Sequence, residues 1–424
     1  MKIRASVQQF NNANVFFVVP LLSAAISAQA AAESGFIEDS SAGLNLRNYY
    51  INRNYVSDSA GQSKAEAWSQ AFILNYKSGF TQGLVGFGVD AMGLYAVKLD
   101  GGRGTPGTQL LPIHDDGRAA DDYGRLAIAG KARISATELK VGEWMPTLPI
   151  LRSDDGRSLP QTFKGAQVTS REIENLTLYG GQFRANSPRN DASMEDMFLA
   201  QKPGVSSDRF NFVGGEYTFN DKRTMLGGWG AELKDIYRQQ MIQVTHSQPI
   251  GKWTLGANLQ WYTGKEDGQA LTGNLDNRTW SGLFSATYRA NTFYIGLQKV
   301  SGADGWMKIN GTSGGSLAND SFSSSYENAN ERSWQVRHDY NFVAVGIPGL
   351  VLMNRYIKGS GIRVGGESGV KEWGRETELA YVFQAGALKD LNIKWRNSTL
   401  RRGWGTNTSF NENRLIINYP LSLF

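Results

Sequence analysis

The 424-residue chain has 44 Lys and Arg, 39 Asp and Glu and no cysteine. The absence of cysteine excludes a disulfide-stapled secreted scaffold, and a formal net charge of only +5 argues against nucleic-acid binding. Glycine (49 residues) and the aromatic residues (11 Trp, 17 Tyr and 20 Phe) are abundant, whereas proline (11 residues) is scarce. This composition, without long apolar runs, is typical of a membrane β-barrel, whose strands show lipid only alternate side chains.

The N-terminal segment has the three parts of an export signal. Lys2 and Arg4 precede a short apolar run, Val15 to Ala28, which is followed by small residues with A-x-A spacing. The run is shorter than the roughly 20 residues that a membrane-spanning helix needs, and Pro20 interrupts it. We therefore expect a cleaved signal peptide over residues 1–32 rather than a membrane anchor.

Beyond this signal, segments of about ten residues alternate between apolar and polar side chains, as strands with one apolar face do. In chain order they include 44–53 (LNLRNYYINR), 68–76, 84–99, 125–135, 253–261, 280–288, 293–297, 333–342, 377–383, 391–398 and 414–424. Aromatic residues stand at the ends of many of these faces, which is the pattern of strands that cross two membrane interfaces. A soluble sandwich or solenoid is the alternative, but it does not require aromatic strand ends.

The connections alternate between short turns and long polar links. The long links are 101–124, 146–167, 186–208, 302–330 and 359–374. About 390 residues at roughly 20 to 24 per strand and connection suggest 16 to 18 strands around an aqueous lumen. We thus predict an all-β fold, a transmembrane antiparallel barrel formed by residues 33–424 as a single domain.

One long link has the composition of a stiff loop that could narrow the lumen. It reads PTLPILRSDDGRSLPQT, is bracketed by prolines, and carries Asp154, Asp155, Arg157 and Ser158. A purely extracellular loop is the alternative.

The strand faces opposite the apolar ones carry basic residues. On the predicted lumen side lie Arg47, Arg53, Arg125, Lys131, Arg133, Arg337, Lys394, Arg396 and Arg414. When the barrel closes, its first strand meets its last two, which brings Arg53, Lys394, Arg396 and Arg414 onto one wall. Adjacent like charges repel, so such an unfavourable cluster indicates a function. Rows of Arg and Lys in a pore guide anions. The alternative is a merely solvated wall, because Asp90, Asp339, Glu376 and Glu378 also point inward.

Enzymatic function is disfavoured. A hydrolase needs a nucleophile, a base and an orienting group in contact, yet the chain has three histidines and no G-x-S-x-G motif. His338 is expected to face lipid. We expect no metal site and no cofactor.

The chain resembles the OprD family of Gram-negative outer-membrane porins, also called Occ carboxylate channels. The matching motifs are SGFIEDSSAGLNLRNYYINR, SGFTQGLVGFGVDAMG, DDYGRLAIAGKARIS, GWGAELKDIYRQQ, SWQVRHDYN, GIPGL, ALKDLNIKWRN and ENRLIINYPLS. The resemblance covers nearly the whole chain after the signal and implies an 18-stranded barrel whose inward-folded loops constrict the lumen at an eyelet.

The resemblance also implies a basic ladder that leads solutes to this eyelet. Carried over by motif, the ladder falls on Arg53, Arg133, Lys394, Arg396 and Arg414. Lys394 stands where arginine is common, and a lysine lacks the two-pronged fork that holds a carboxylate. The acidic candidates for the eyelet are Asp154, Asp155 and Asp320.

These features together predict a selective porin for passive diffusion of small carboxylates. Cyclic or aromatic carboxylates are favoured because the mature chain is short for the family; the alternatives are a channel for basic amino acids such as arginine and a non-selective porin. The expected location is the Gram-negative outer membrane. The expected partners are small carboxylate solutes, outer-membrane lipid and lipopolysaccharide, and the barrel-assembly machinery, with no nucleic acid. The expected oligomeric state is a monomer or a weak trimer.

Overall fold

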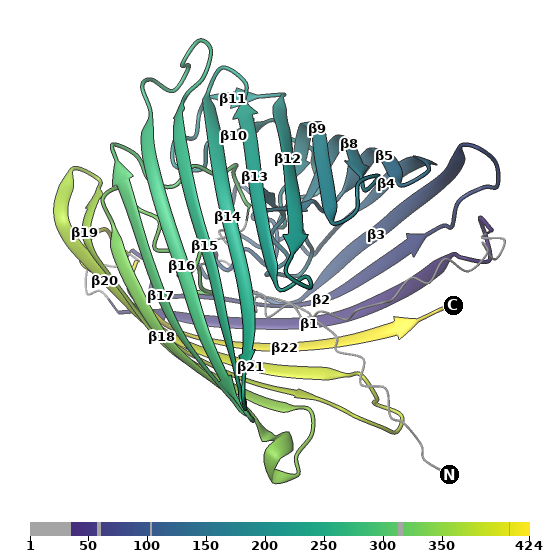
Figure 1. The fold of residues 1–424 in the computed structure, drawn as a ribbon. Helices are drawn as coiled ribbons and strands as arrows, with labels where there is room; N and C mark the ends of the chain where they lie inside the picture. Colours follow the sequence, from purple (N-terminus) through teal and green to yellow (C-terminus); the bar gives the residue numbers. More distant parts are fainter. Residues whose placement is uncertain (1–34, 57–60, 102–103, 313–316, 407) are drawn as a thin grey trace.

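The computed structural model describes residues 35–56, 61–101, 104–312, 317–406 and 408–424, which form one closed barrel (Figure 1). The predicted signal peptide lies outside the described residues and stays a prediction. The strands of the wall are β1 (Ser41–Tyr55), β2 (Lys64–Lys77), β3 (Gly86–Asp100), β4 (Asp122–Ile134), β5 (Thr137–Trp144), β8 (Thr162–Ser170), β9 (Leu176–Ser187), β12 (Phe210–Phe219), β13 (Thr224–Leu233), β14 (Tyr237–Ile250), β15 (Trp253–Glu266), β16 (Asp276–Tyr288), β17 (Asn291–Gly302), β18 (Arg332–Asn341), β19 (Leu350–Val364), β20 (Glu367–Val382), β21 (Asn392–Arg402) and β22 (Phe410–Ser422).

Short elements lie in the connections between these strands. They are β6 (Thr147–Leu148), β7 (Leu151–Arg152), β10 (Met197–Phe198), β11 (Ser206–Ser207) and the 3-10 helix η1 (Phe342–Val345). Among the described residues, no helix is both long and apolar enough to cross a membrane.

The barrel closes because its first strand pairs with both the second and the last. β1 runs antiparallel to β2 and to β22, with Leu44 opposite Leu421 and Arg53 opposite Glu412 across the seam. The sheet has 18 strands, each antiparallel to its neighbours. The prediction of an all-β antiparallel barrel of about 18 strands is confirmed.

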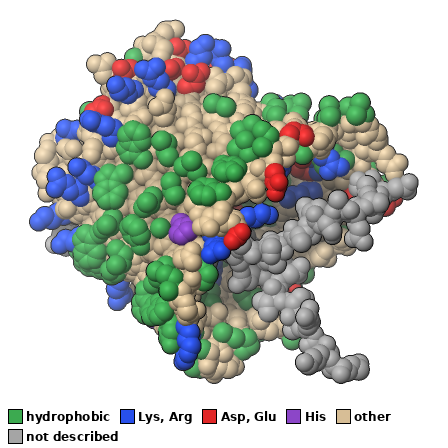
Figure 2. Space-filling model, in the orientation of Figure 1, with side chains coloured by type: hydrophobic (Ala, Val, Ile, Leu, Met, Phe, Trp, Pro, Cys, Tyr) green, Lys and Arg blue, Asp and Glu red, His purple; other side chains and the backbone are tan. Residues whose placement is uncertain are grey.

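Alternation along each strand separates an apolar outer face from the inner one. On β4 the outward Leu126 and Ile128 are 62% and 50% exposed, whereas the inward Ala127 and Ala129 are almost fully buried. Figure 2 shows hydrophobic side chains spread over the outer surface, with Lys and Arg side chains toward its upper and left margins. This outer face is what a barrel presents to lipid.

Most connections at the end that carries the C-terminus are tight turns, as predicted. The long links are at the opposite end, with one correction. Residues 359–374, expected to be a long loop, are mostly strand, because β19 runs to Val364 and β20 begins at Glu367. Gly365 and Gly366 alone make the turn, with φ of 57° and 85°, values that a two-residue hairpin requires and glycine adopts freely.

The buried core lies inside the barrel, where long links pack on the inner wall. One cluster joins Trp144, Phe163 and Phe183 of the wall to Leu148 and Ile309 of the links. A second joins Tyr49 and Ile51 of β1 to Leu110 and Leu159. The lumen is therefore partly filled by the chain's own loops, and the functional site must lie where these loops meet the basic wall.

Candidate functional site

The predicted basic cluster forms on the inner wall between β18 and β1. Arg396 on β21 lies directly opposite Arg414 on β22, and Arg337 on β18 lies directly opposite Arg355 on β19. The side chains of Arg396 and Arg414 are 4% and 2% exposed, so loops cover them from the lumen. Two directly opposed like-charge pairs on one wall are unfavourable unless other groups compensate.

Carboxylates on the same wall provide part of that compensation. Glu412 bridges Arg53 (2.8 Å) and Arg414 (2.6 Å). Glu378 contacts Arg396 at 2.5 Å and Lys394 at 3.7 Å. Asp339 accepts two hydrogen bonds from Arg337, at 2.6 and 2.7 Å, and Glu376 pairs with Arg355. These six cations share four carboxylates. Elsewhere on the same wall Arg402 pairs with Glu372 at 2.8 Å, and Arg47 pairs with Asp155 of a link.

An aromatic ring from the 303–331 link covers the centre of this cluster. The guanidinium carbons of Arg396, Arg414 and Arg355 lie 4.8, 5.3 and 5.4 Å from the centroid of the Phe322 ring. Arg414 also donates to the Phe322 carbonyl. A cation over an aromatic face is worth up to about 2 kcal/mol when desolvated, so the ring and the three guanidiniums hold each other in place. We call Arg355, Arg396, Arg414 and Phe322 the arginine cluster.

The 145–161 link folds into the barrel and reaches the first two strands. Arg47 on β1 donates to the Asp155 carboxylate at 2.7 Å and to the Arg157 carbonyl at 2.8 Å. Ser158 and Ser69 on β2 share a hydrogen bond of 2.7 Å. The link thus lies inside the barrel against β1 and β2 and occupies part of the lumen.

The remaining residues of this link are paired with other loops. Asp154 pairs with Arg189 at 2.5 Å, and Arg157 donates to the Thr108 carbonyl at 2.7 Å. Burial lowers the pKa of Arg157 well below its ordinary value, and the nearby charge of Arg189 lowers it further.

Asp320 marks the place where the two inward links approach each other. Burial raises its pKa to about 7, and the hydrogen bond of Ser325 and the charge of Lys308 only partly oppose this. Asp320 also interacts electrostatically with Arg152 on β7, and its backbone carbonyl accepts from Arg355 at 3.3 Å. It therefore joins the 145–161 link to the arginine cluster.

The three predicted cations of β4 point inward but belong to a different part of the wall, three strands from β1. Arg125 donates to the Asp191 carbonyl at 2.5 Å, and so braces a loop. Lys131 pairs with Asp90 at 2.8 Å. Arg133 is exposed and lies over the Phe80 ring, 4.2 Å from its centroid. The structure does not bring these residues to the arginine cluster.

The lumen widens into a cavity of about 870 Å³ on the side of the barrel opposite the arginine cluster. Trp144, Tyr179, Trp229 and Tyr294 line it together with Arg152 of the constricting link. Tyr179 and Trp229 stack with ring centroids 4.9 Å apart. This cavity has room for a small ring-bearing solute.

Two residues of the arginine cluster were not predicted from the sequence. Arg355 lies in LVLMNRYIKG, where apolar residues occupy both phases, so alternation does not assign its face. Phe322 lies in an irregular link, and no periodic pattern indicates its position. The neighbouring Ser321 and Ser323 both donate to Glu376 and so hold Phe322 against the wall, but their presence in the sequence does not indicate this contact.

The comparisons with known proteins agree with this architecture. The family model described as outer membrane porin, OprD family, matches residues 34–423. The chain is 64% identical to the porin-like protein GalP of Pseudomonas putida over 95% of this chain and 96% of that protein.

Two solved structures from Pseudomonas aeruginosa contain a small acid. OccK2 (OpdF) in complex with glucuronate is 59% identical, with a TM-score of 0.86. OpdK with vanillate is 48% identical, with a TM-score of 0.87. In both comparisons 92% of this chain and all of the other chain are covered.

Proposed function

Because this chain belongs to the OprD family of outer membrane porins, we propose that its barrel admits small carboxylates selectively, cyclic ones above all. The protein is a porin-like channel of the Gram-negative outer membrane, and its relatives are channels rather than enzymes. The observation that carries the proposal is the arginine cluster, in which Arg396 and Arg414 lie directly opposite each other beside Arg355.

The charge balance of the wall favours a bound anion. Around the arginine cluster, six cations share four carboxylates, so a solute carboxylate can supply the missing charge. A guanidinium offers a planar fork that binds both carboxylate oxygens at once. Several such sites in a row let a solute move stepwise, since each site releases it to the next.

Phe322 must give way for this transfer. It covers Arg396 and Arg414, so a carboxylate reaches these guanidiniums by replacing the ring contact. A solute with both a ring and a carboxylate can put its own ring in the place of the Phe322 ring and pair its carboxylate with the guanidiniums. This favours cyclic acids. The small acids bound to the two relatives, glucuronate and vanillate, are of this kind.

A channel for basic amino acids is the second candidate, and the acidic residues would carry it. Asp154 and Asp155 are already paired with Arg189 and Arg47, which leaves little negative charge for a cationic solute. Asp320 is the remaining acidic candidate, and its raised pKa keeps part of it neutral near pH 7. The carboxylate channel is thus the better-supported function.

The test is solute uptake by liposomes that contain the purified protein. Benzoate and glucuronate should enter faster than arginine. Arg396→Gln with Arg414→Gln should slow the two acids by roughly tenfold, the value of one charge-assisted hydrogen bond, and leave arginine uptake unchanged or faster. The matched control is Arg375→Gln, an exposed arginine on the outer face of β20.

Two results would contradict the proposal. Faster arginine than benzoate uptake in the wild type would assign selectivity to the acidic loop residues. An equal loss of all three solutes in the double variant would mean that the arginines shape the pore without selecting charge.

A further inference from the structure

The outer face of the barrel carries strand cations at the rim where the long links lie. They alternate with outward apolar residues and comprise Arg238, Lys265, Arg278, Lys299, Arg332, Lys358 and Lys371. At the opposite rim, the exposed outward residues of the corresponding strands are apolar or aromatic, and include Tyr217, Phe219, Ile250, Trp253 and Phe293. Apart from Arg278, which pairs with Asp276, these strand cations form no ion pair within the described residues, and their lipid-facing position indicates an anionic partner on that side.

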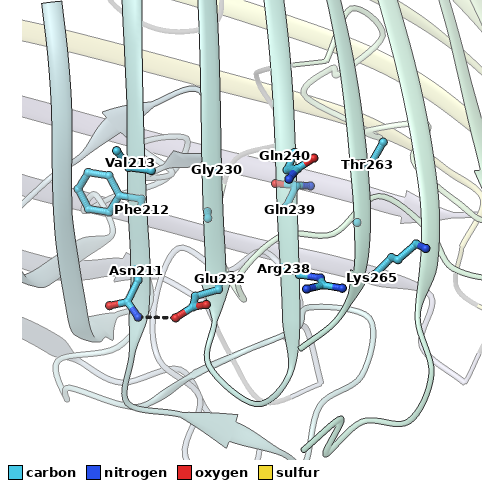
Figure 3. A pocket seen from close by; sticks show the side chains of 12 residues that line it. Asn211, Phe212, Val213, Gly230, Glu232, Arg238, Gln239, Gln240, Thr263 and Lys265 are labelled. Atoms are coloured by element: carbon cyan, nitrogen blue, oxygen red, sulfur yellow. Dashed lines mark hydrogen bonds between the residues drawn. The ribbon is translucent and has the colours of Figure 1, made fainter. Parts of the chain in front are cut away.

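A shallow hollow of about 730 Å³ lies within this rim, across β12 to β15 (Figure 3). Gly230, which has no side chain, forms its floor between Val213 and Gln240. Figure 3 shows Arg238 and Lys265 on adjacent strands near the strand ends, with Asn211 and Glu232 beside them. The hollow therefore combines an apolar part with a polar margin.

Neither cation of the hollow forms an ion pair within the described part of the chain, although the charge of Glu266 interacts with both at longer range. Arg238 and Lys265 are directly opposite each other, which places their Cβ atoms about 5 Å apart and makes them repel. Within the described part of the chain, no carboxylate lies within ion-pairing distance of either. Glu232 is opposite Arg238 on the other side, but its carboxylate accepts from Asn211 Nδ2 at 2.6 Å. Lys299 and Arg332 form a second pair of directly opposed cations on the same rim.

We propose that this hollow binds a phosphate group of lipopolysaccharide, the phosphorylated glycolipid of the outer leaflet. The cations lie at the level where the apolar face ends, since the exposed Trp261 is on the same face of β15 as Lys265, four residues away. Aromatic residues mark the headgroup boundary. The ligand must therefore place phosphate at headgroup depth and acyl chains below it.

The location on the loop side selects this lipid over the phospholipids of the inner leaflet. In barrels of this kind the long loops face the cell exterior, and lipopolysaccharide occupies that leaflet. The amide of Gln240 and the hydroxyl of Thr263 line the hollow beside the cations and can bind the sugar hydroxyls. Phosphate would neutralise the Arg238–Lys265 pair through charge-assisted hydrogen bonds.

The experiment measures lipid binding to the purified barrel in detergent by native mass spectrometry. The probes are bisphosphorylated lipid A, the same lipid A without phosphate, and phosphatidylglycerol. Lipid A affinity should fall about tenfold in Arg238→Gln with Lys265→Gln, because charge-assisted hydrogen bonds are lost. The charge-keeping swap, Arg238→Lys with Lys265→Arg, should retain binding. The dephosphorylated lipid should bind the wild type as weakly as lipid A binds the Gln variant.

The matched control removes two exposed lysines at the opposite rim, Lys252→Gln with Lys389→Gln, and should bind lipid A like the wild type. Unchanged lipid A binding in the Arg238 and Lys265 Gln variant would overturn the proposal. So would an equal loss in the control, which would indicate attraction by net charge alone. Phosphatidylglycerol binding as tight as that of lipid A would overturn the assignment to lipopolysaccharide.

Discussion

Arg47 and Asp155 are 108 residues apart in the chain, yet their side chains form two hydrogen bonds, of 2.7 and 3.2 Å, inside the barrel. Arg47 belongs to the wall, and Asp155 to the link that folds into the lumen. The Arg47 side chain is 8% exposed and that of Asp155 is 36% exposed. This contact is the strut that holds the constriction against β1, and it can be removed without touching the arginine cluster.

Asp155→Ala should therefore loosen the constriction. Arg47 keeps the carbonyl of Arg157 but loses its countercharge, at a cost of about 2 kcal/mol. We expect a folded barrel with a larger and noisier single-channel conductance in planar bilayers. Asp116→Ala is the control, because Asp116 pairs with its neighbour Arg118 in an exposed loop. An unchanged current would mean that the link stays in place without this strut.

Phe322→Ala should uncover the arginine cluster. Three guanidiniums lose their aromatic cover, so chloride as well as carboxylates can reach them. We expect a higher anion conductance and a smaller preference for benzoate over chloride, measured as a reversal potential in mixed salts. Phe80→Ala is the matched control, since Phe80 lies over Arg133 and Lys131 on a different wall. A current that falls in Phe322→Ala would contradict a covering role.

Asp320 should make ion selectivity depend on pH near neutrality. Because burial raises its pKa to about 7, the side chain is charged above that pH and neutral below it. Loss of this negative charge should increase the permeability ratio of anions to cations as the pH falls from about 8 to about 6. Asp320→Asn should show the low-pH ratio throughout. If the permeability ratio changed with pH in Asp320→Asn as it does in the wild type, another group would be responsible.

Glu331 should destabilise the protein as the pH rises. Burial and the neighbouring charge of Glu372 raise the pKa of Glu331 well above its usual range. A carboxyl with a raised pKa in the folded state binds more protons there than when unfolded, so the free energy of unfolding falls as the pH rises from the unfolded pKa through the folded one.

Glu331→Gln should remove this loss, since an amide carries no charge and can donate to Glu372. The variant should melt at a higher temperature than the wild type at pH 8, with a smaller difference at pH 4 to 5. Glu367→Gln, at the exposed first residue of β20, should leave the melting temperature unchanged. A variant less stable than the wild type at pH 8 would mean that the Glu331 charge is favourable.

The wall of the barrel could be predicted from the sequence because each strand carries its own evidence. Leu126 and Ile128 face outward, as their alternation with small residues predicts, and His338 shares the outward phase of Trp334 and Val336, stacking on Phe293. The same phase rule places Arg396 and Arg414 inward. Their meeting follows from closure, which joins the two ends of the sheet.

The loops could not be predicted to the same depth, because their contacts depend on partners far away in the chain. Nothing local to Phe322 indicates that three arginines from β19, β21 and β22 will surround it. Arg125 has the same inward phase as Arg396, yet it binds loop carbonyls rather than the cluster. Phase assigns a side chain to a face; its partners on that face depend on how the links fill the lumen.

The seam between β1 and β22 links assembly to selectivity. Arg414 and Glu412 belong to the last wall strand in the chain, and Glu412 meets Arg53 only when that strand docks on the first. Until then Arg53 lacks its countercharge, and Glu412 pairs only with Arg414 of its own strand. A barrel still open at this edge therefore lacks one ion pair of the basic wall. The wall acquires its final charge pattern in the same step that closes the sheet.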